Sequence, residues 1–149
     1  MQVHFEGTFS PHHRLNLQAL VVNAYALLQR HYPQLPPGAA GIDTAIISEN
    51  PGYLGYVGGS TMHLSAAYLE ACTIPWLASL FEHEGTHKLN AATKYAPEDL
   101  WQNELSACEA QMRVGLVVGF EGYELHYLHT YMGNKPAMEA HMVLGYKGP

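Results

Sequence analysis

Residues 75–90 are the part of this chain whose fold is most constrained by the sequence. Thr73-Ile74-Pro75 is typical of a helix start, because proline is tolerated in the first turn. Apolar residues then recur at helical spacing along one side: Leu77, Leu80, Phe81 and Leu89. The same segment contains His83-Glu84-Gly85-Thr86-His87, so a helix here places two imidazoles one turn apart on one face.

The rest of the chain alternates periodic apolar segments with proline and glycine breaks. Helical periodicity predicts further helices at residues 15–31, 97–118, 123–132 and 137–144. Short β-branched and aromatic runs predict strands at residues 42–48, 53–57 and 60–65. Residues 66–71 are ambiguous between irregular structure and one helical turn. The chain has no obvious linker, so we expect a single domain, residues 1–149, of the α+β class.

Composition narrows the class of protein and of partner. Hydrophobic residues make up 48% of the 149, which suits a globular chain that buries its own core. A net charge of −6 with only seven Lys plus Arg argues against a nucleic acid partner, because phosphate binding needs clustered positive charge. The sequence has neither a signal-peptide pattern nor an apolar run of about 18 residues, so we expect a cytoplasmic protein without a membrane span. Its two cysteines, Cys72 and Cys108, are then expected to be reduced.

The two histidines of the central helix predict a zinc site. Imidazoles four residues apart on a helix can each give a nitrogen to one Zn²⁺ at about 2.1 Å. Glu84 would not bind the ion but would take a proton from the water that the ion activates and hand it to the leaving amine. The competing interpretation is a chance motif on a helix surface, and it has weight because the chain contains ten histidines.

A hydrolytic zinc site usually has three protein ligands and one open position. The candidates for the third ligand are Asp99, Glu104, Glu109 and the later histidines. A histidine in the pattern HExxHxxGxxH is excluded, because Asn90 and Thr93 occupy the positions of its glycine and last histidine. Glu104 is preferred, since it follows a short loop and antiparallel packing of two helices would bring it to the metal. Glu109 lies five positions further on, off the same helical face.

The pair of segments His83-Glu84-Gly85-Thr86-His87 and Asn103-Glu104-Leu105-Ser106-Ala107 resembles the gluzincin clan of zinc metallopeptidases, to which the thermolysin-like enzymes belong. In size the chain is most similar to the compact minigluzincins. The resemblance implies His83, His87 and Glu104 as zinc ligands and Glu84 as general base and acid. It also implies a zincin-like fold, with a backing helix, a small mixed sheet, an active-site helix and a following glutamate helix.

One position departs from the pattern of this clan. Thermolysin-like enzymes carry an aspartate four residues after the glutamate ligand, where it orients a zinc histidine, and here that position is Cys108. A histidine ligand still requires a hydrogen bond to its second nitrogen. The sequence leaves Asp99, Asn103, Glu109 and a backbone carbonyl open as the partner.

Peptide hydrolysis also requires a group that stabilises the oxyanion beside the metal. Tyr131 and His126 are the candidates, with His129 as a further one, and the alternative is an aromatic stripe in the core. We expect residues 60–65 to form an unpaired edge strand that holds an extended peptide by main-chain bonds, or else an ordinary edge strand. The pair His12-His13 fits a solvated turn better than a second metal site.

These features together predict a zinc metallopeptidase acting on peptides or unfolded protein segments. The alternatives are a zinc-binding regulatory or latent peptidase-like module with little turnover, an effector domain of a larger assembly, and a helical protein without metal. A peptidase in the cytoplasm needs restraint, and residues 136–149 are apolar enough to lie across the cleft and make it latent. The residues that would fill the cleft are Met138, His141, Met142 and Tyr146. The sequence makes no prediction of the oligomeric state.

Overall fold

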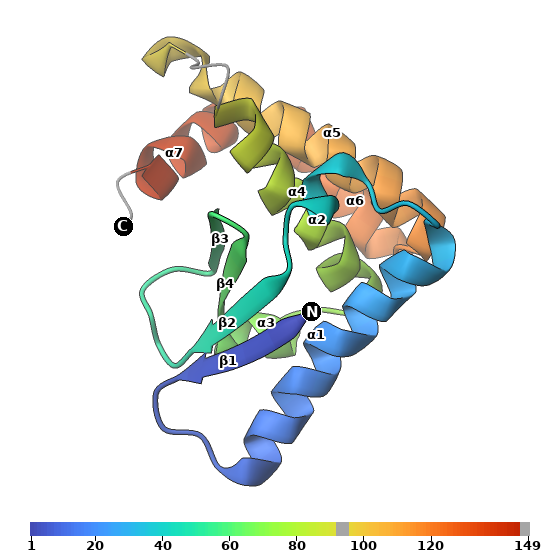
Figure 1. Cartoon of the computed structure of the whole chain (residues 1–149). Coiled ribbons are helices and arrows are strands. Elements are labelled where there is room, and N and C mark those ends of the chain that lie inside the picture. Colours follow the sequence, from blue (N-terminus) through green and yellow to red (C-terminus); the bar gives the residue numbers. More distant parts are fainter. Residues whose placement is uncertain (92–95, 147–149) are drawn as a thin grey trace.

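The computed structural model describes residues 1–91 and 96–146, without the side chains of residues 91, 97 and 143–146. The described residues form a four-stranded sheet, seven α-helices and one short 3₁₀ helix, which confirms the expected α+β class (Figure 1). No helix in this part of the chain combines the length and apolar character needed to cross a lipid bilayer.

The strands lie in the order β1-β2-β4-β3. Their bounds are β1 Gln2–Glu6, β2 Thr44–Ser48, β3 Gly55–Gly58 and β4 Thr61–Ser65. β1, β2 and β4 are parallel, and β3 is antiparallel to β4. The three predicted strands are therefore confirmed as β2, β3 and β4. β1 was not predicted, because it is short and pairs with residues far along the chain, Gln2 lying opposite Thr44.

The prediction that residues 60–65 form an unpaired edge strand is wrong. β4 pairs with β2 on one side and with β3 on the other. The hairpin between β3 and β4 turns at Gly59, whose φ of +61° favours glycine, and it places β3 on the outside. β3 is therefore the edge strand on this side of the sheet.

The helices begin and end near the breaks in the sequence. The bounds are α1 Pro11–His31, α2 Pro37–Ala40, α3 Ala66–Ala71, α4 Ile74–Ala91, α5 Leu100–Val118, α6 Gly122–Met132 and α7 Lys135–Tyr146. The 3₁₀ helix η1, Pro97–Asp99, precedes α5. Serine side chains cap α1 and α3: Ser10 Oγ accepts from His13 N at 3.1 Å, and Ser65 Oγ accepts from Tyr68 N at 3.2 Å. The predicted helices are confirmed, residues 66–71 are helical, and α2 is an addition within a proline-rich stretch.

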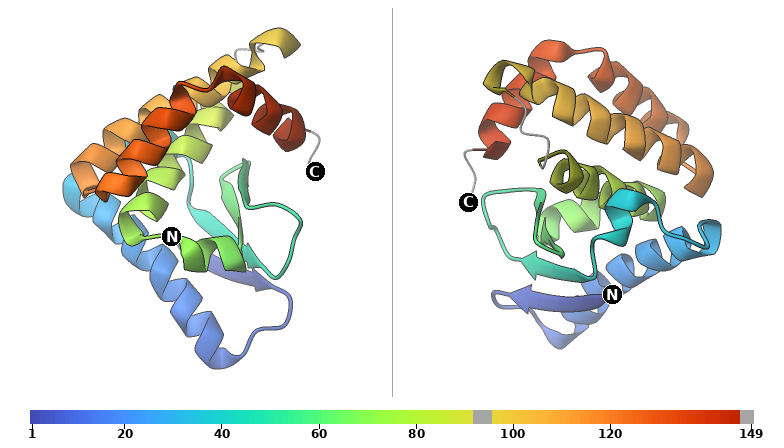
Figure 2. Two further views of the ribbon diagram at one scale, coloured as in Figure 1. Left: turned by 180° about the vertical axis from the view of Figure 1, so that it is seen from behind. Right: turned by 45° about the horizontal axis from the view of Figure 1, so that its top comes forward.

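The main core lies between the sheet and two helices. The inward-facing residues of the sheet are Ala45, Ile47, Met62 and Leu64. They belong to one buried cluster with Leu17, Val21 and Leu28 of α1 and with Leu77 and Phe81 of α4. α5 packs along α4, and α6 and α7 pack in turn against α5 (Figure 2). α4 is therefore enclosed between the sheet and the C-terminal helices, which fixes its position on both sides.

Candidate metal centre

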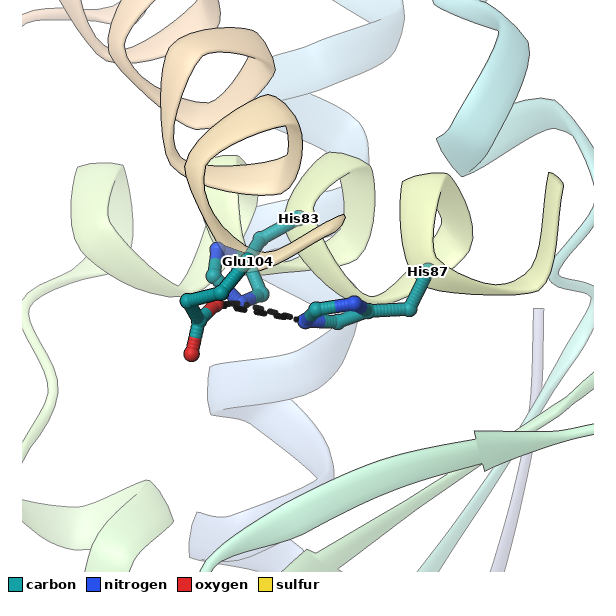
Figure 3. Close-up of side chains that lie close together, drawn as sticks. All are labelled: His83, His87 and Glu104. Atoms are coloured by element: carbon teal, nitrogen blue, oxygen red, sulfur yellow. Dashed lines mark hydrogen bonds and ion pairs between the residues drawn. The ribbon is translucent and has the colours of Figure 1, made fainter. Parts of the chain in front are cut away.

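α4 and α5 bring three side chains to one point. His83 and His87 lie one turn apart on α4, and Glu104 comes from the start of α5 (Figure 3). Glu104 Oε1 is 2.9 Å from His83 Nε2 and 3.3 Å from His87 Nε2, and the two Nε2 atoms are 3.1 Å apart. Within the described residues, this is the group of potential ligand side chains whose donor atoms all lie within 4.8 Å of one another. The three residues expected to bind metal are thus brought together.

The triangle of donor atoms has nearly the size that a tetrahedral metal requires. Atoms at about 2.1 Å from Zn²⁺ in tetrahedral geometry lie about 3.4 Å apart. The observed edges lie between 2.9 and 3.3 Å, so each side chain would move outward by only a fraction of an ångström. Two imidazole nitrogens and one carboxylate oxygen are also the donor set of many hydrolytic zinc sites. The group can therefore hold a metal ion, and other divalent transition metals share a preference for such ligands.

Without an ion, the same side chains form a buried polar cluster. His83 is 7% exposed and Glu104 is 1% exposed. Burial disfavours the charged form of His83, but the Cys108 thiol, the Glu104 carboxylate and the charge of Glu84 outweigh it and raise its pKa well above 6.5. Burial also disfavours the charged form of Glu104, but hydrogen bonds from His83 and His87 hold its pKa below the ordinary value. A bound ion would therefore replace a proton that these side chains share.

The second ring nitrogens of the two histidines have different surroundings. His87 Nδ1 lies 3.1 Å from Asn103 Oδ1, so Nδ1–H donates to the amide and Nε2 is left to face the cluster. Asn90 Nδ2 donates to the same Oδ1 at 3.0 Å and to Ser106 Oγ at 3.1 Å, which fixes the Asn103 amide. His83 Nδ1 is buried and no described residue offers it a hydrogen bond. Among the partners that the sequence left open, Asn103 is thus the one that orients His87.

Two later helices hold the outer oxygen of Glu104. The Tyr131 hydroxyl on α6 donates to Oε2 at 3.0 Å, and His141 Nε2 on α7 lies 3.1 Å from the same atom. Oε1 is left to face the histidine pair, which is the orientation of a ligand that binds through one oxygen. Met138 and Met142, both buried and one turn of helix apart from each other, anchor α7 next to this contact. The sequence placed His141 only among the later histidines and the residues that could fill the cleft, because nothing in its spacing connects it to Glu104.

The remaining candidates lie around this cluster or away from it. Glu84 Oε1 lies 3.9 Å from His83 Nε2, beside the ligand triangle. Tyr131 reaches the site through Glu104, and its role at the oxyanion stays a prediction. His126 is exposed on α6, five residues before Tyr131 and therefore about 140° round the helix from it. His129 is also exposed on α6.

Other potential ligands named from the sequence do not join the triangle. Glu109 is exposed on α5, and Asp99 lies at the end of η1, where its Oδ1 accepts from Gln102 Nε2 at 3.4 Å. His12 and His13 lie in the first turn of α1, so the prediction of a turn before this helix is wrong. His13 Nε2 lies 2.6 Å from Glu70 Oε1 at the surface.

A close contact behind the motif explains its glycine. A Cβ atom at Gly85 would lie 2.0 Å from the carbonyl oxygen of Gly38 on α2, so no larger residue fits. In the same contact Glu82 Oε2 accepts from Ala39 N at 2.8 Å. α2 thus fixes the rotation of α4 about its axis, and with it the direction of both imidazoles.

No protein-family model, curated protein or solved structure matches this chain. The chemistry of this chain is therefore inferred from the geometry of the site itself. His83, His87 and Glu104 form a group that could hold a metal ion, and Glu84 lies beside it.

Proposed function

We propose that this chain is a zinc-dependent metallopeptidase of the gluzincin type. The observation that carries the proposal is the triangle of His83 Nε2, His87 Nε2 and Glu104 Oε1, on two helices in the order that the motif requires. The order of elements adds support, with α1 as backing helix, a mixed sheet with an antiparallel edge strand, α4 as active-site helix and α5 as glutamate helix. On this proposal the fold is zincin-like.

The residues around the triangle divide the work of hydrolysis. When bound, zinc would lower the pKa of a water molecule and polarise the substrate carbonyl. The Glu84 carboxylate, next to His83, would accept the proton of the water at Oε1 and pass it to the leaving amine. Asn103 keeps His87 in the tautomer that leaves Nε2 free. Tyr131 and His141 keep the outer oxygen of Glu104 engaged, so that Oε1 faces the histidines.

β3 is the element that would bind the substrate main chain. It is the edge strand and it packs beside α4, the helix that carries the histidines. An edge strand can add an extended peptide through main-chain hydrogen bonds. We therefore propose peptides or unfolded protein segments as substrates, because a folded protein rarely presents an extended strand without other pairing.

A zinc-binding module with little turnover is the second candidate function. The position of His141 beside the ligand triangle favours it. Its side chain is 57% exposed, yet its imidazole reaches Glu104 beside the ligand triangle. The segment expected to cover the cleft forms α7 up to Tyr146, and residues 147–149 lie outside the described residues. Deleting it would remove the buried Met138 and Met142, so His141→Ala is the cleaner test of latency. At saturating zinc, which offsets the lost contact to Glu104, activity should rise in this variant if the imidazole blocks the site.

Metal content and peptide cleavage together test the proposal. Purified protein should contain about one zinc per chain, and Glu104→Ala should lose it or bind it weakly. His31→Ala, which removes an exposed histidine of α1, is the matched control and should keep the zinc. Glu84→Gln should keep the zinc and lose cleavage of a mixed fluorogenic peptide library. Wild-type protein that binds no zinc, or Glu84→Gln protein that cleaves at the wild-type rate, would contradict the proposal.

A further inference from the structure

A pocket near the start of α4 is not used by the mechanism above. It has a volume of about 230 Å³ and opens between the end of α3, the start of α4 and the first turns of α6. Four aromatic side chains line it: Tyr68, Trp76, Tyr123 and Tyr127. Pockets for drug-sized ligands begin at about 300 Å³, so this one suits a single amino-acid side chain.

The pocket lies on the same helix faces as the metal centre. Trp76 precedes His83 by seven residues, which is two turns of α4, so both lie on one face about 10 Å apart. Tyr127 precedes Tyr131 by one turn of α6, and their rings stack at 6.4 Å. An extended peptide advances about 3.3 Å per residue, so the pocket is within three residues of a bond held at the metal.

The charge at the pocket wall is negative. Glu124 is 5% exposed, and its carboxylate is held by the Thr73 hydroxyl, which donates to Oε2 at 2.6 Å, and by Glu121 N, which donates to Oε1 at 2.9 Å. The N-terminal ends of α4 and α6 each contribute about half a positive charge, whereas Glu124 in the lining contributes a full negative charge. Glu121, which caps α6 just outside the lining, contributes a second. The lining includes no Lys, Arg or His. Burial and then the charge of Glu124 raise the pKa of the Cys72 thiol to about 12, as expected beside a buried carboxylate.

We propose that this pocket binds the side chain of a lysine or arginine close to the cleaved bond of the peptide substrate. The inference rests on the proposed function and adds a preference for basic substrates. Trp76 and Tyr127 line the pocket with their ring centroids 5.9 Å apart, and Glu124 lies in the same lining. A cation bound there is attracted by the electron-rich rings and by the carboxylate. The aliphatic stem of the same side chain packs against the aromatic walls. Such a ligand also accounts for Tyr123 and Tyr127, two large aromatic side chains that are more than half exposed at this site.

Binding can be measured without turnover. The background carries Glu84→Gln, which prevents cleavage, and Trp101→Phe, which leaves Trp76 as the single tryptophan of the chain. The fluorescence of Trp76 is recorded while the protein is titrated with capped peptides of five residues. These peptides are alanine throughout except for lysine, norleucine, phenylalanine or glutamate at the centre. We expect the lysine peptide to bind at least tenfold more tightly than the norleucine peptide, and this ratio to fall as salt rises.

Variants of the wall identify the cause of the preference. Glu124→Gln keeps an acceptor for Glu121 N. It should reduce the ratio of the affinity for the lysine peptide to that for the norleucine peptide at least threefold. Tyr127→Leu should also reduce it, and this exposed position is safe for folding should Glu124→Gln prove unstable. Glu70→Gln, which removes a charge from the exposed face of α3, is the control and should leave the ratio unchanged. The inference would be overturned if the norleucine or phenylalanine peptide bound as tightly as the lysine peptide or more tightly. It would also be overturned if the glutamate peptide bound most tightly of the four.

Cleavage assays distinguish this inference from the proposed function. If the zinc-loaded protein binds the lysine peptide selectively but cleaves none of the peptides, the pocket is supported and the proposed peptidase activity is refuted. Efficient cleavage with no selectivity for basic residues in either assay would refute the pocket and leave the peptidase standing.

Discussion

Tyr131→Phe is the most direct test of how the metal centre is built. The substitution deletes one oxygen atom and keeps the ring, which stacks on Tyr127. It removes the hydrogen bond that the hydroxyl donates to Glu104 Oε2 at 3.0 Å. We expect weaker metal binding, because Glu104 would no longer be held with Oε1 toward the two histidines.

The expected size follows from the surroundings of Oε2. A hydrogen bond to a charged acceptor contributes about 1.5–3 kcal/mol, and Glu104 is so deeply buried that water cannot replace the lost donor. His141 Nε2 remains 3.1 Å from the same oxygen, so the atom keeps a partner and the lower end, about 1.5 kcal/mol, applies. The metal-free protein makes the same bond, so this loss divides between stability and metal affinity. An equal division would weaken metal binding about three- to fourfold. This is less than the tenfold or more that is usual for substitutions behind metal ligands, because His141 keeps the oxygen engaged.

Two measurements separate these effects. Competition with a chelator of known affinity gives the metal affinity, and urea unfolding of the metal-free protein gives its stability. Tyr127→Phe, which removes a hydroxyl one turn away, should leave the affinity within about twofold of the wild type. The double variant Tyr131→Phe/His141→Ala deprives Oε2 of both partners and should weaken binding by more than the two single effects combined. Wild-type affinity and stability in Tyr131→Phe would refute the reasoning.

Three further predictions concern the proton, the helix contact and the histidine tautomer. The raised pKa of His83 stabilises the metal-free fold below the ordinary value of 6.5, and this contribution is lost as pH rises through the raised value. Metal competes with that proton, so chelator competition should show affinity that increases with pH across neutrality, by up to about tenfold per unit; a flat profile would contradict this. Gly85→Ala should lower the free energy of unfolding by more than about 3 kcal/mol, because the new Cβ would lie 2.0 Å from the Gly38 carbonyl oxygen. A melting temperature within a few degrees of the wild type would show that this contact is not tight. Asn103→Ala should weaken zinc binding about 10- to 100-fold, because His87 Nδ1 loses its acceptor, and unchanged affinity would remove Asn103 from the site.

Local patterns in the sequence were sufficient where the structure depends on neighbours along the chain. The helical period of residues 75–90 places His83 and His87 one turn apart whatever surrounds the helix. Proline and glycine breaks located most of the helices, including the one that carries Glu104. In each case the determining interaction spans only a few residues, so its signal is present in the local sequence.

Long-range packing decided what the sequence could not. The edge of the sheet is β3 and not β4, because strand order depends on which strand pairs with β2, and no local pattern records that choice. Asn103 was one of several possible partners for a histidine ligand until α5 docked on α4. His141 lies 37 positions from Glu104, and only the packing of α7 beside α5 brings them to 3.1 Å.

The sequence by itself therefore determined a helix with two imidazoles on one face and a glutamate in position to approach it. The tertiary structure decided that three donor atoms converge at 2.9 to 3.3 Å, which side chains orient them, and where an aromatic pocket lies relative to them. The physical reason is that a metal site requires agreement within tenths of an ångström between separate helices. Such agreement comes from close packing, here including the Gly38–Gly85 contact, and not from the periodicity of any one segment.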